Sequence, residues 1–242
     1  MIYTENLTKH FGDNAAVDTL NLDIKDGEFF CFLGPNGAGK TTTIKMLTGL
    51  LHPTRGRALL GGFDIQKEPV KAKQLVGYIP DSPFLYEKLT GREFMHFVAG
   101  LYQMPETQVN GYGEELLELF GIRNVGDHLI EDYSHGMRQK LSFASCFLHE
   151  PKIVIVDEPW VGLDPKNIRF VKDFLKEKTR DGLTVFMSTH TLSIAEEVAD
   201  RIGIIHNGKL LHMGTVAEIM ALASHPGSLE EVFLELTQGD EA

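Results

Sequence analysis

Positions 32–47, FLGPNGAGKTTTIKML, place three glycines, a proline and a lysine between an apolar run and a helical pattern. Gly34, Gly39, Lys40 and Thr41 match the spacing G-x-x-x-x-G-K-[ST] of a phosphate-binding loop. Glycines in such a loop let backbone N–H groups turn inward around an anion, and a side chain would block the approach of a phosphate. The spacing therefore predicts a loop that binds the phosphates of a nucleotide.

The polar residues that end this loop have separate predicted roles. Lys40 is expected to reach the β- and γ-phosphates, and the hydroxyl of Thr41 can hold Mg²⁺. The apolar run 29–33 supplies a strand before the loop, and a helix predicted over 42–50 adds unpaired N–H groups at its start. We expect the nucleotide to contact Gly34, Pro35, Asn36, Gly37, Ala38, Gly39, Lys40, Thr41 and Thr42.

Two acidic residues follow a second apolar run. The segment IVIVDEP places Asp157 and Glu158 at the carboxyl end of a short, fully apolar strand, which is where α/β folds bind ligands. Asp157 can hold Mg²⁺ directly or from outside its first layer of ligands. Glu158 can polarise an attacking water as a general base. The alternative is a pair of solvated acids without a role, and the phosphate loop in the same chain favours the catalytic interpretation.

A second helix start lies in YSHGMRQKLSFA, positions 133–144. Ser134 can cap the helix that begins just after it, and Gly136 leaves its N–H accessible. Such a start can bind an anion. The alternative is a plain helix cap, and this segment alone favours that alternative.

The charge of the chain limits its partners. Its 242 residues fit one large domain or two small ones, and 43% hydrophobic with 24% charged residues is typical of globular proteins. A formal net charge of −11 gives no global field that attracts nucleic acid, so we expect no nucleic-acid partner. ATP, a polyanion, must then be bound by local features, and Lys40 with its loop supplies them.

The remaining composition points to the cytoplasm. No apolar stretch approaches the ~18 residues of a membrane helix. The N-terminal MIYTENLTKHFGD lacks the basic-then-apolar pattern of a secretion signal, so we expect a cytoplasmic chain. Cys31 and Cys146 form no C-x-x-C pair, and their apolar surroundings predict buried thiols instead of metal ligands.

Apolar periodicity indicates how the chain is organised. Short apolar runs and turns in the first third predict strands, some of them in hairpins. From 90 to 150 the pattern is helical, opened by a capping box of Thr90 and Glu93. After Pro151, buried strands again alternate with amphipathic helices. The sequence predicts an α/β fold with a P-loop NTPase core of mostly parallel sheet, an N-terminal antiparallel β portion and an α-helical insertion.

Five motifs in order, GPNGAGKTT, YSHGMRQ, IVIVDEP, GLDP and STH, resemble the ATP-binding subunit of an ABC transporter. The resemblance covers nearly the whole chain. It implies one ABC-type ATP-binding domain over 1–242, with a catalytic core at 1–80 and 151–242 and a helical subdomain at 81–150 that carries the signature. It also implies that two subunits pack head to tail. Each ATP, with Mg²⁺, would lie between one subunit's phosphate loop and the other's signature.

The same resemblance implies roles for residues outside the loop. It assigns Ser134 and Gly136 to the γ-phosphate bound by the partner, and Asp164 to a contact across the dimer. His190 of STH would orient the γ-phosphate and the attacking water. The adenine would stack on Phe11, with Val17 nearby.

Four positions depart from the family's pattern. Asp81 follows GYIP, where the family usually has Gln or, in some exporters, Glu. Its shorter side chain leaves open whether this metal candidate contacts Mg²⁺ or water. His135 and Met137 replace the usual Gly and Gln of the signature, and Trp160 replaces a small polar residue. None of these changes removes a phosphate ligand of the loop, so we expect an active ATPase.

The resemblance implies an ATPase that drives a separate integral membrane permease from the cytoplasmic face of the cell membrane. Its partner subunit would be a second copy or a homologous ATPase. YSHGM and the ending SLEEVFLELT resemble the branch that exports drugs, antibiotics and polysaccharides. The transported substrate would be selected by the permease. Phe84, Leu85 and Tyr86 form an apolar cluster that would contact the permease or, alternatively, only pack the insertion onto the core.

Two other classes of function compete with this one. Soluble ABC proteins include chromosome ATPases with a long coiled coil and ribosomal factors with tandem cassettes, and this sequence has neither feature. A cluster-assembly scaffold fits the length, and co-purification with a membrane protein would distinguish a transporter from it. A phosphate-loop kinase would leave the signature and STH unexplained.

Overall fold

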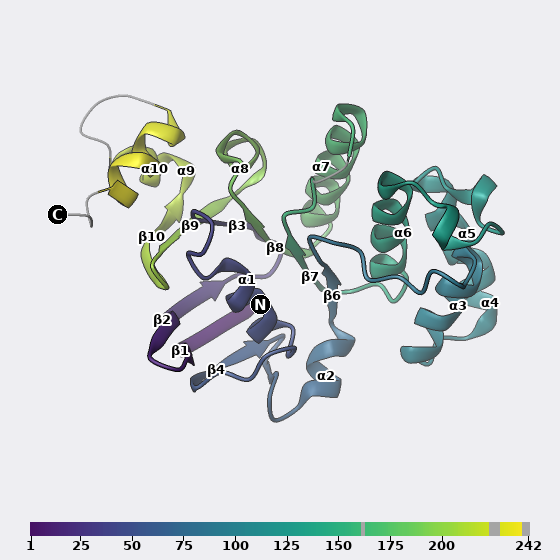
Figure 1. Cartoon of the computed structure of the whole chain (residues 1–242), viewed down its shortest axis with the longest axis horizontal. Coiled ribbons are helices and arrows are strands. Elements are labelled where there is room, and N and C mark those ends of the chain that lie inside the picture. The colour runs from purple at the N-terminus through teal and green to yellow at the C-terminus, as the bar shows by residue number, and fades with distance from the viewer. Residues whose placement is uncertain (161–162, 223–227, 239–242) are drawn as a thin grey trace.

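The computed structural model describes residues 1–160, 163–222 and 228–238, and within that part the chain forms two sheets with helices around them (Figure 1). Gly162, which opens the GLDP motif, lies outside the described residues. The larger sheet has the order β10-β9-β3-β8-β7-β6. Strands β9, β3, β8, β7 and β6 run parallel, and β10 pairs antiparallel with β9. Its strands are β3 (Phe29–Leu33), β6 (Val76–Ile79), β7 (Ile153–Asp157), β8 (Thr184–Thr189), β9 (Arg201–His206) and β10 (Lys209–Thr215).

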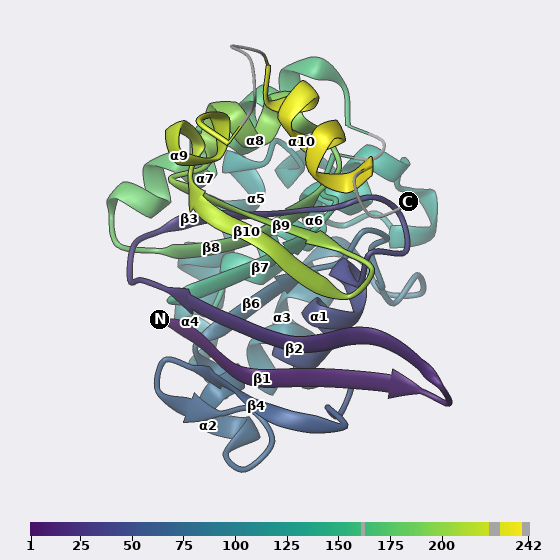
Figure 2. The same cartoon turned by 90° about the vertical axis from the view of Figure 1, so that its left-hand side faces the viewer.

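The smaller sheet is antiparallel and has the order β2-β1-β4-β5 (Figure 2). Its strands are β1 (Ile2–Phe11), β2 (Asn14–Ile24), β4 (Arg55–Leu60) and β5 (Phe63–Asp64). Side chains of β3 alternate between two cores, as the two-residue period of a strand requires. Phe30 and Phe32 pack with the small sheet and the first helix, whereas Phe29, Cys31 and Leu33 pack with the helices on the other face. The strand before the phosphate loop is therefore fixed from both sides.

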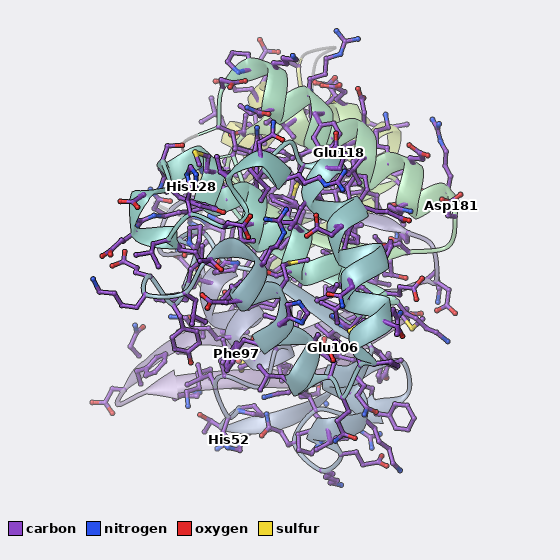
Figure 3. The ribbon with its side chains drawn as sticks, turned by 90° about the vertical axis from the view of Figure 1, so that its right-hand side faces the viewer. His52, Phe97, Glu106, Glu118, His128 and Asp181 are labelled. Carbon is purple, nitrogen blue, oxygen red and sulfur yellow. The ribbon has the colours of Figure 1, made fainter. Side chains whose placement is uncertain are left out.

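Helices cover both faces of the large sheet and form a separate helical region on one side, seen face-on in Figure 3. That region contains α3 (Gly91–Leu101), α4 (Glu106–Gln108), a π-helical turn (Val109–Gly113), α5 (Glu114–Leu119), two short 3₁₀ turns (Arg123–Val125, Ile130–Asp132) and α6 (His135–Phe147). The other helices are α1 (Lys40–Leu47), α2 (Pro69–Gln74), α7 (Pro165–Arg180), α8 (Leu192–Val198), α9 (Val216–Met220) and α10 (Leu229–Gln238).

The predicted α/β fold is confirmed, including the mostly parallel sheet, the antiparallel N-terminal portion and the helical insertion. The capping box at Thr90 is present, with both of its hydrogen bonds. Helix α1 begins two residues before the predicted start and ends earlier, at Leu47, because Gly49 takes a left-handed φ of 68°. Cys31 and Cys146 are buried free thiols, and burial raises the pKa of both.

Helix length and hydropathy bear on membrane insertion. Among the described helices, none combines the length and the apolar composition that a bilayer crossing needs.

Candidate functional site

A cavity of about 270 Å³ lies where β3 passes through the phosphate loop into α1. Lys40 and Thr41 reach it from the loop, Asp81 from the segment after β6, and Glu158 from the end of β7. Parallel strands end at one edge of their sheet, which explains why residues far apart in sequence meet here. The full lining is Ala16, Asn36, Gly37, Gly39, Lys40, Thr41, Thr42, Asp81 and Glu158.

The glycines of the loop do more than leave space for a phosphate. A Cβ on Gly39 would lie 2.4 Å from the carbonyl oxygen of Ala16, and its φ is 110°. A Cβ on Gly34 would lie 2.5 Å from the carbonyl oxygen of Ile205. At Gly37 the space is open and only a φ of 82° favours glycine. Two of the three glycines therefore serve to pack the loop against β2 and β9.

The start of α1 offers donors to an anion. Its N-cap is Gly39, which has no side chain to bond to the first N–H groups, and no acidic residue lies in the first turn. The first N–H groups of a helix have no intrahelical partner and carry the positive end of the dipole. This helix start can bind a phosphate through its backbone.

Lys40 lies buried at the back of this helix start. Its Nζ donates hydrogen bonds to the carbonyl oxygens of Gly34 at 2.7 Å and Pro35 at 3.2 Å. The same Nζ lies 3.9 Å from Oε1 of Glu158. Burial lowers the pKa of Lys40, and the charges of Glu158 and Asp157 oppose that shift. The ammonium group is thus held next to the cavity by neutral carbonyls that a phosphate oxygen can replace.

Glu158 is held by its backbone and by a histidine. Its φ of 44° is in the left-handed region, which is uncommon for a residue with a side chain. Backbone strain of this kind is often found at active sites. Oε1 of Glu158 lies 2.9 Å from Nδ1 of His190, an ion pair when the imidazole is protonated. The structure thus brings the two predicted catalytic residues together from the ends of neighbouring strands β7 and β8.

Asp157 is fixed by a partner that sequence reasoning missed. Its side chain is buried, and the hydroxyl of Ser188 donates a hydrogen bond to its Oδ1. The two residues pair in register across β7 and β8. Oδ2 of Asp157 is buried without a partner among the described residues. A buried carboxylate oxygen without a donor is costly unless a cation or an ordered water completes it.

These oxygens fit a divalent cation only in part. Thr41 and Asp81 line the cavity, whereas Asp157 is not one of its lining residues, although its buried Oδ2 has no partner among the described residues. Within the described ranges, no three His, Cys, Asp or Glu side chains converge tightly enough to hold a metal alone. Mg²⁺ suits such a site, because it is usually held by one or two carboxylates together with phosphates and water.

Ser134, Gly136 and Asp164 lie outside this cavity. Ser134 is the N-cap of α6, and its side chain accepts a hydrogen bond from the N–H of Met137 at 3.3 Å. Gly136 lies in the first turn of the same helix. Asp164 caps α7 and accepts from the N–H of Asn167 at 2.9 Å, a bond that lowers the pKa of its carboxyl. The predicted cap at Ser134 is confirmed, and the chain alone does not bring these residues to Lys40.

The two residues predicted near the adenine, Phe11 and Val17, differ in exposure. Phe11 ends β1 with 53% of its surface exposed, and Nζ of Lys9 lies 5.2 Å from its ring centroid. Val17, also predicted to lie near the adenine, is buried. Its exposed fraction is 0%, because the alternation of β2 turns it into the core against Gly39. Its neighbour Ala16, which sequence reasoning missed, lines the cavity instead.

The strand, loop and helix around this cavity, on a mostly parallel sheet, define a phosphate-loop nucleoside triphosphatase. The chain belongs to the ABC transporter family, whose sequence model matches residues 17–161. It has the ATP-hydrolysing cassette of that family. The family, fold and enzyme class predicted from the motifs are confirmed.

Individual relatives agree with this assignment. The chain is 37% identical over 240 residues to the probable multidrug ABC transporter ATP-binding protein YbhF of Escherichia coli (strain K12). That match covers 98% of this chain and 41% of YbhF, so the chain spans less than half the length of this relative. A solved ATP-binding subunit of an ABC transporter superposes with a TM-score of 0.92 at 32% identity, covering 98% of this chain and 99% of the other.

A second solved structure shows such a cassette after hydrolysis. It is the dimeric cassette MJ0796 with ADP and phosphate bound. The TM-score is 0.82 at 25% identity, and the match covers 89% of this chain and 99% of that one.

Proposed function

We propose that this chain is the ATP-hydrolysing subunit of an export-type ABC transporter and that it works as a dimer on a separate membrane permease. One observation carries the proposal. Lys40, Thr41, Asp81 and Glu158 converge on one cavity at a helix start that has no side-chain cap. A buried cation, free N–H donors and a carboxylate at one point are what binding and hydrolysing a nucleoside triphosphate require.

The phosphates of ATP would lie on the loop from Gly34 to Thr42. Lys40 would exchange its bonds to the carbonyls of Gly34 and Pro35 for phosphate oxygens, a change from neutral to charged acceptors that strengthens each bond. The exposed ring of Phe11 would stack on the adenine. Mg²⁺ would be held by Thr41, which lines the cavity together with Asp81, and by Asp157, whose buried Oδ2 has no partner among the described residues. The cation would neutralise phosphate charge.

Glu158 would act as the general base for the attacking water. Its carboxylate lies at the cavity, and its Oε1 has no hydrogen-bond donor of good geometry among the described residues. His190, 2.9 Å away through Nδ1, would fix the orientation of that carboxylate and contact the γ-phosphate. The left-handed φ of Glu158 keeps the carboxylate aimed at the cavity instead of along the strand.

The active site would be completed by a second subunit, either another copy or a homologous ATPase. Ser134 and Asp164 are exposed and lie outside the cavity that holds Lys40. The start of α6 and the loop before α7 would therefore reach the γ-phosphate of the partner in a head-to-tail dimer. The dimeric arrangement of a cassette that resembles this chain supports the proposal.

The helical region, within the predicted subdomain 81–150, would contact the permease. Phe84 and Tyr86 are 85% and 59% exposed, and Leu85 packs partly against the core. Together with Phe94 and Leu101, Phe84 and Leu85 line an apolar cavity of about 420 Å³. Exposed aromatic clusters of this kind mark protein contacts. The chain would then lie on the cytoplasmic face of the cell membrane, and export follows from the similarity to YbhF.

The test of this proposal is the substitution Glu158→Gln. Wild-type protein should release phosphate from Mg-ATP, and Glu158→Gln should lower kcat by about 10²–10⁴-fold, the usual contribution of a positioned base. Binding of ATP should persist, because no phosphate ligand is removed. Glu118→Gln, a charge-matched change at a 66% exposed position of α5, should leave kcat unchanged. Near-normal phosphate release from Glu158→Gln would assign the base elsewhere, with His190 as the next candidate.

A further inference from the structure

Two short segments of the helical region lie side by side just before α6. The N–H of Glu131 donates to the carbonyl of Glu87 at 3.1 Å, and the N–H of Ile130 donates to that of Leu89 at 2.9 Å. Thr90 and Leu129 form an antiparallel bridge at the end of this pairing. The segment after Asp81 is therefore joined by its backbone to the segment that leads into the start of α6.

Arg138, in the first turn of α6, connects this pairing to the helix start. Its Nε donates to the carbonyl oxygen of Tyr133 at 3.2 Å, and its Nη2 donates to that of Glu131 at 3.0 Å. Its Nη1 donates to Oε1 of Glu87 at 2.8 Å. All three guanidinium nitrogens are used, and all three partners precede Ser134 in the chain.

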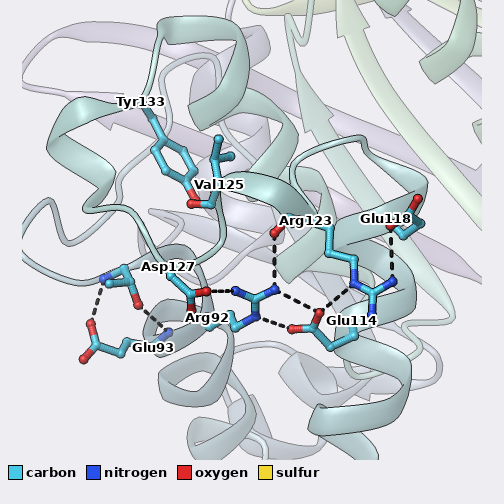
Figure 4. Close-up of polar contacts among 9 residues, drawn as sticks. Arg92, Glu93, Glu114, Glu118, Arg123, Val125, Asp127 and Tyr133 are labelled. Carbon is cyan, nitrogen blue, oxygen red and sulfur yellow. Dashed lines mark hydrogen bonds and ion pairs between the residues drawn. The ribbon is translucent and has the colours of Figure 1, made fainter.

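The position of the Tyr133 carbonyl determines that of Ser134. This carbonyl belongs to the planar peptide unit whose nitrogen is that of Ser134, so holding the oxygen fixes the plane. The Tyr133 side chain is buried, and its hydroxyl donates to the carbonyl of Val125 at 2.7 Å (Figure 4). Ring and carbonyl together hold the residue that precedes the cap.

A second arginine, Arg92 of α3, contacts a different set of residues in the helical region. Arg92 contacts Glu114 at 2.5 Å and Asp127 at 2.6 Å, and it donates to the carbonyl of Arg123 at 3.2 Å (Figure 4). These contacts lie on 114–127, whereas those of Arg138 lie on 131–133 and Glu87. Of the two arginines, Arg138 is the one whose side chain contacts the residue before Ser134.

We propose that Arg138 is a positioning residue, which fixes Ser134 for the phosphate of the partner subunit and ties it to the segment 86–89. This inference rests on the proposed shared active site. An arginine suits this role because its planar guanidinium holds its N–H donors in fixed directions. The ammonium group of a lysine is a single point charge and cannot reach three acceptors in this way. The segment 86–89 begins at the exposed Tyr86, so a partner bound there would act on the start of α6 through Glu87.

Arg138→Lys separates this role from charge alone, because it keeps the cation and loses the fork. We expect kcat for Mg-ATP to fall roughly 10-fold to 100-fold, since small misplacements of a reacting constellation cost that much. KM for ATP should stay within about twofold, because the chain's own phosphate loop is intact. The matched control is Arg123→Lys. Among the described residues, the Arg123 side chain forms ion pairs with Glu114 and Glu118, and the kcat of this variant should equal that of the wild type.

Hydrogen exchange of the amides at 134–138, without nucleotide, gives a readout that does not depend on hydrolysis. Exchange there should be faster in Arg138→Lys than in the wild type, while the amides of β7 keep their rates in both variants. Wild-type kcat together with wild-type exchange in Arg138→Lys would overturn the inference. An equal loss of kcat in Arg123→Lys would also overturn it. If wild-type protein fails to hydrolyse Mg-ATP, the proposed function fails, and the exchange rates alone decide for or against Arg138.

Discussion

The starts of α1 and α6, which by their sequences can each bind an anion, differ in structure. Helix α1 begins at Lys40 after the N-cap Gly39, has no side-chain cap and opens onto a cavity that the buried Lys40 lines. Helix α6 begins at His135 after the exposed N-cap Ser134, whose hydroxyl accepts a hydrogen bond from the N–H of Met137. At the first start no cap side chain bonds to the N–H groups and a cation lies beside them, whereas the cap of the second start bonds to one of its own N–H groups. Within one chain, therefore, the start of α1 has the features of a phosphate-binding site, whereas the start of α6 is a capped helix start.

The two helices also differ in how they are anchored. Helix α1 is packed between the two sheets, where Ile44, Met46 and Leu47 are fully buried. Helix α6 leaves its start at the surface, and just beyond its far end His149 stacks on Tyr102 with ring centroids 3.7 Å apart. Nε2 of His149 lies 3.2 Å from the carbonyl of Val76, the first residue of β6. The start of α6 is therefore held by polar contacts at the surface, whereas α1 is held by burial in the core.

The largest effect should come from combining defects in the two helix starts. Lys40→Ala removes the cation at α1, and Ser134→Arg places a bulky charge at α6, so each protein alone should lose nearly all hydrolysis. A mixed dimer contains one site with both defects and one site with neither. Mixing should therefore restore ATP-dependent dimerisation, measured by light scattering, together with phosphate release if a single site suffices.

The control for this mixture pairs Lys40→Ala with Glu158→Gln. Lys40 and Glu158 both lie on the side of the active site that carries the phosphate loop, not on the side that carries Ser134. Each of the two sites in the mixed dimer therefore keeps one defect. Hydrolysis should not return. If the Lys40→Ala and Ser134→Arg mixture stays inactive while wild-type protein works as a strict monomer, Ser134 is only a helix cap.

Local signals made much of this fold predictable. The strand before the phosphate loop, the loop itself and the capping box at Thr90 each depend on residues a few positions apart. The burial of Val17 could not be predicted, because the direction of its side chain depends on how β2 sits in its sheet. Ser188 was missed because it bonds to Asp157 across 31 residues, and Arg138 reaches Glu87 across 51. Pairings between strands and loops set these contacts, and no short motif records them.

A smaller effect, on the pH dependence of stability, should come from His149, just beyond the C-terminal end of α6. Burial lowers the pKa of His149 to about 4 from its ordinary 6.5, so the folded state holds the neutral form. Between pH 6.5 and pH 4 the imidazole of His149 is protonated in the unfolded chain but not in the folded one. The free energy of unfolding therefore decreases as pH falls from 6.5 to 4. Because His149 is partly exposed, solvent reduces the loss to about 1–2 kcal/mol.

Urea unfolding of wild type and His149→Gln at pH 7 and pH 4.5 measures this loss. Glutamine can still reach the carbonyl of Val76 and does not titrate, so the variant should lose less stability on acidification. His128→Gln, at an exposed position of the same region, should behave as wild type (Figure 3). An equal pH dependence in wild type and His149→Gln would show that His149 does not carry the effect.

The smallest effect separates the two roles of Ser134. Without nucleotide, Ser134→Ala should cost about 0.5–1 kcal/mol in unfolding free energy, the low half of the range for an N-cap, because its bond to Met137 is long at 3.3 Å. Ser134→Thr keeps a hydroxyl and should lose less. Urea unfolding with an unchanged m-value measures both. If Ser134→Ala weakens ATP-dependent dimerisation by more than tenfold while costing under about 1 kcal/mol of stability, the hydroxyl acts mainly on the partner's phosphate. A loss of dimerisation no larger than the loss of stability would leave α6 with a cap and nothing more.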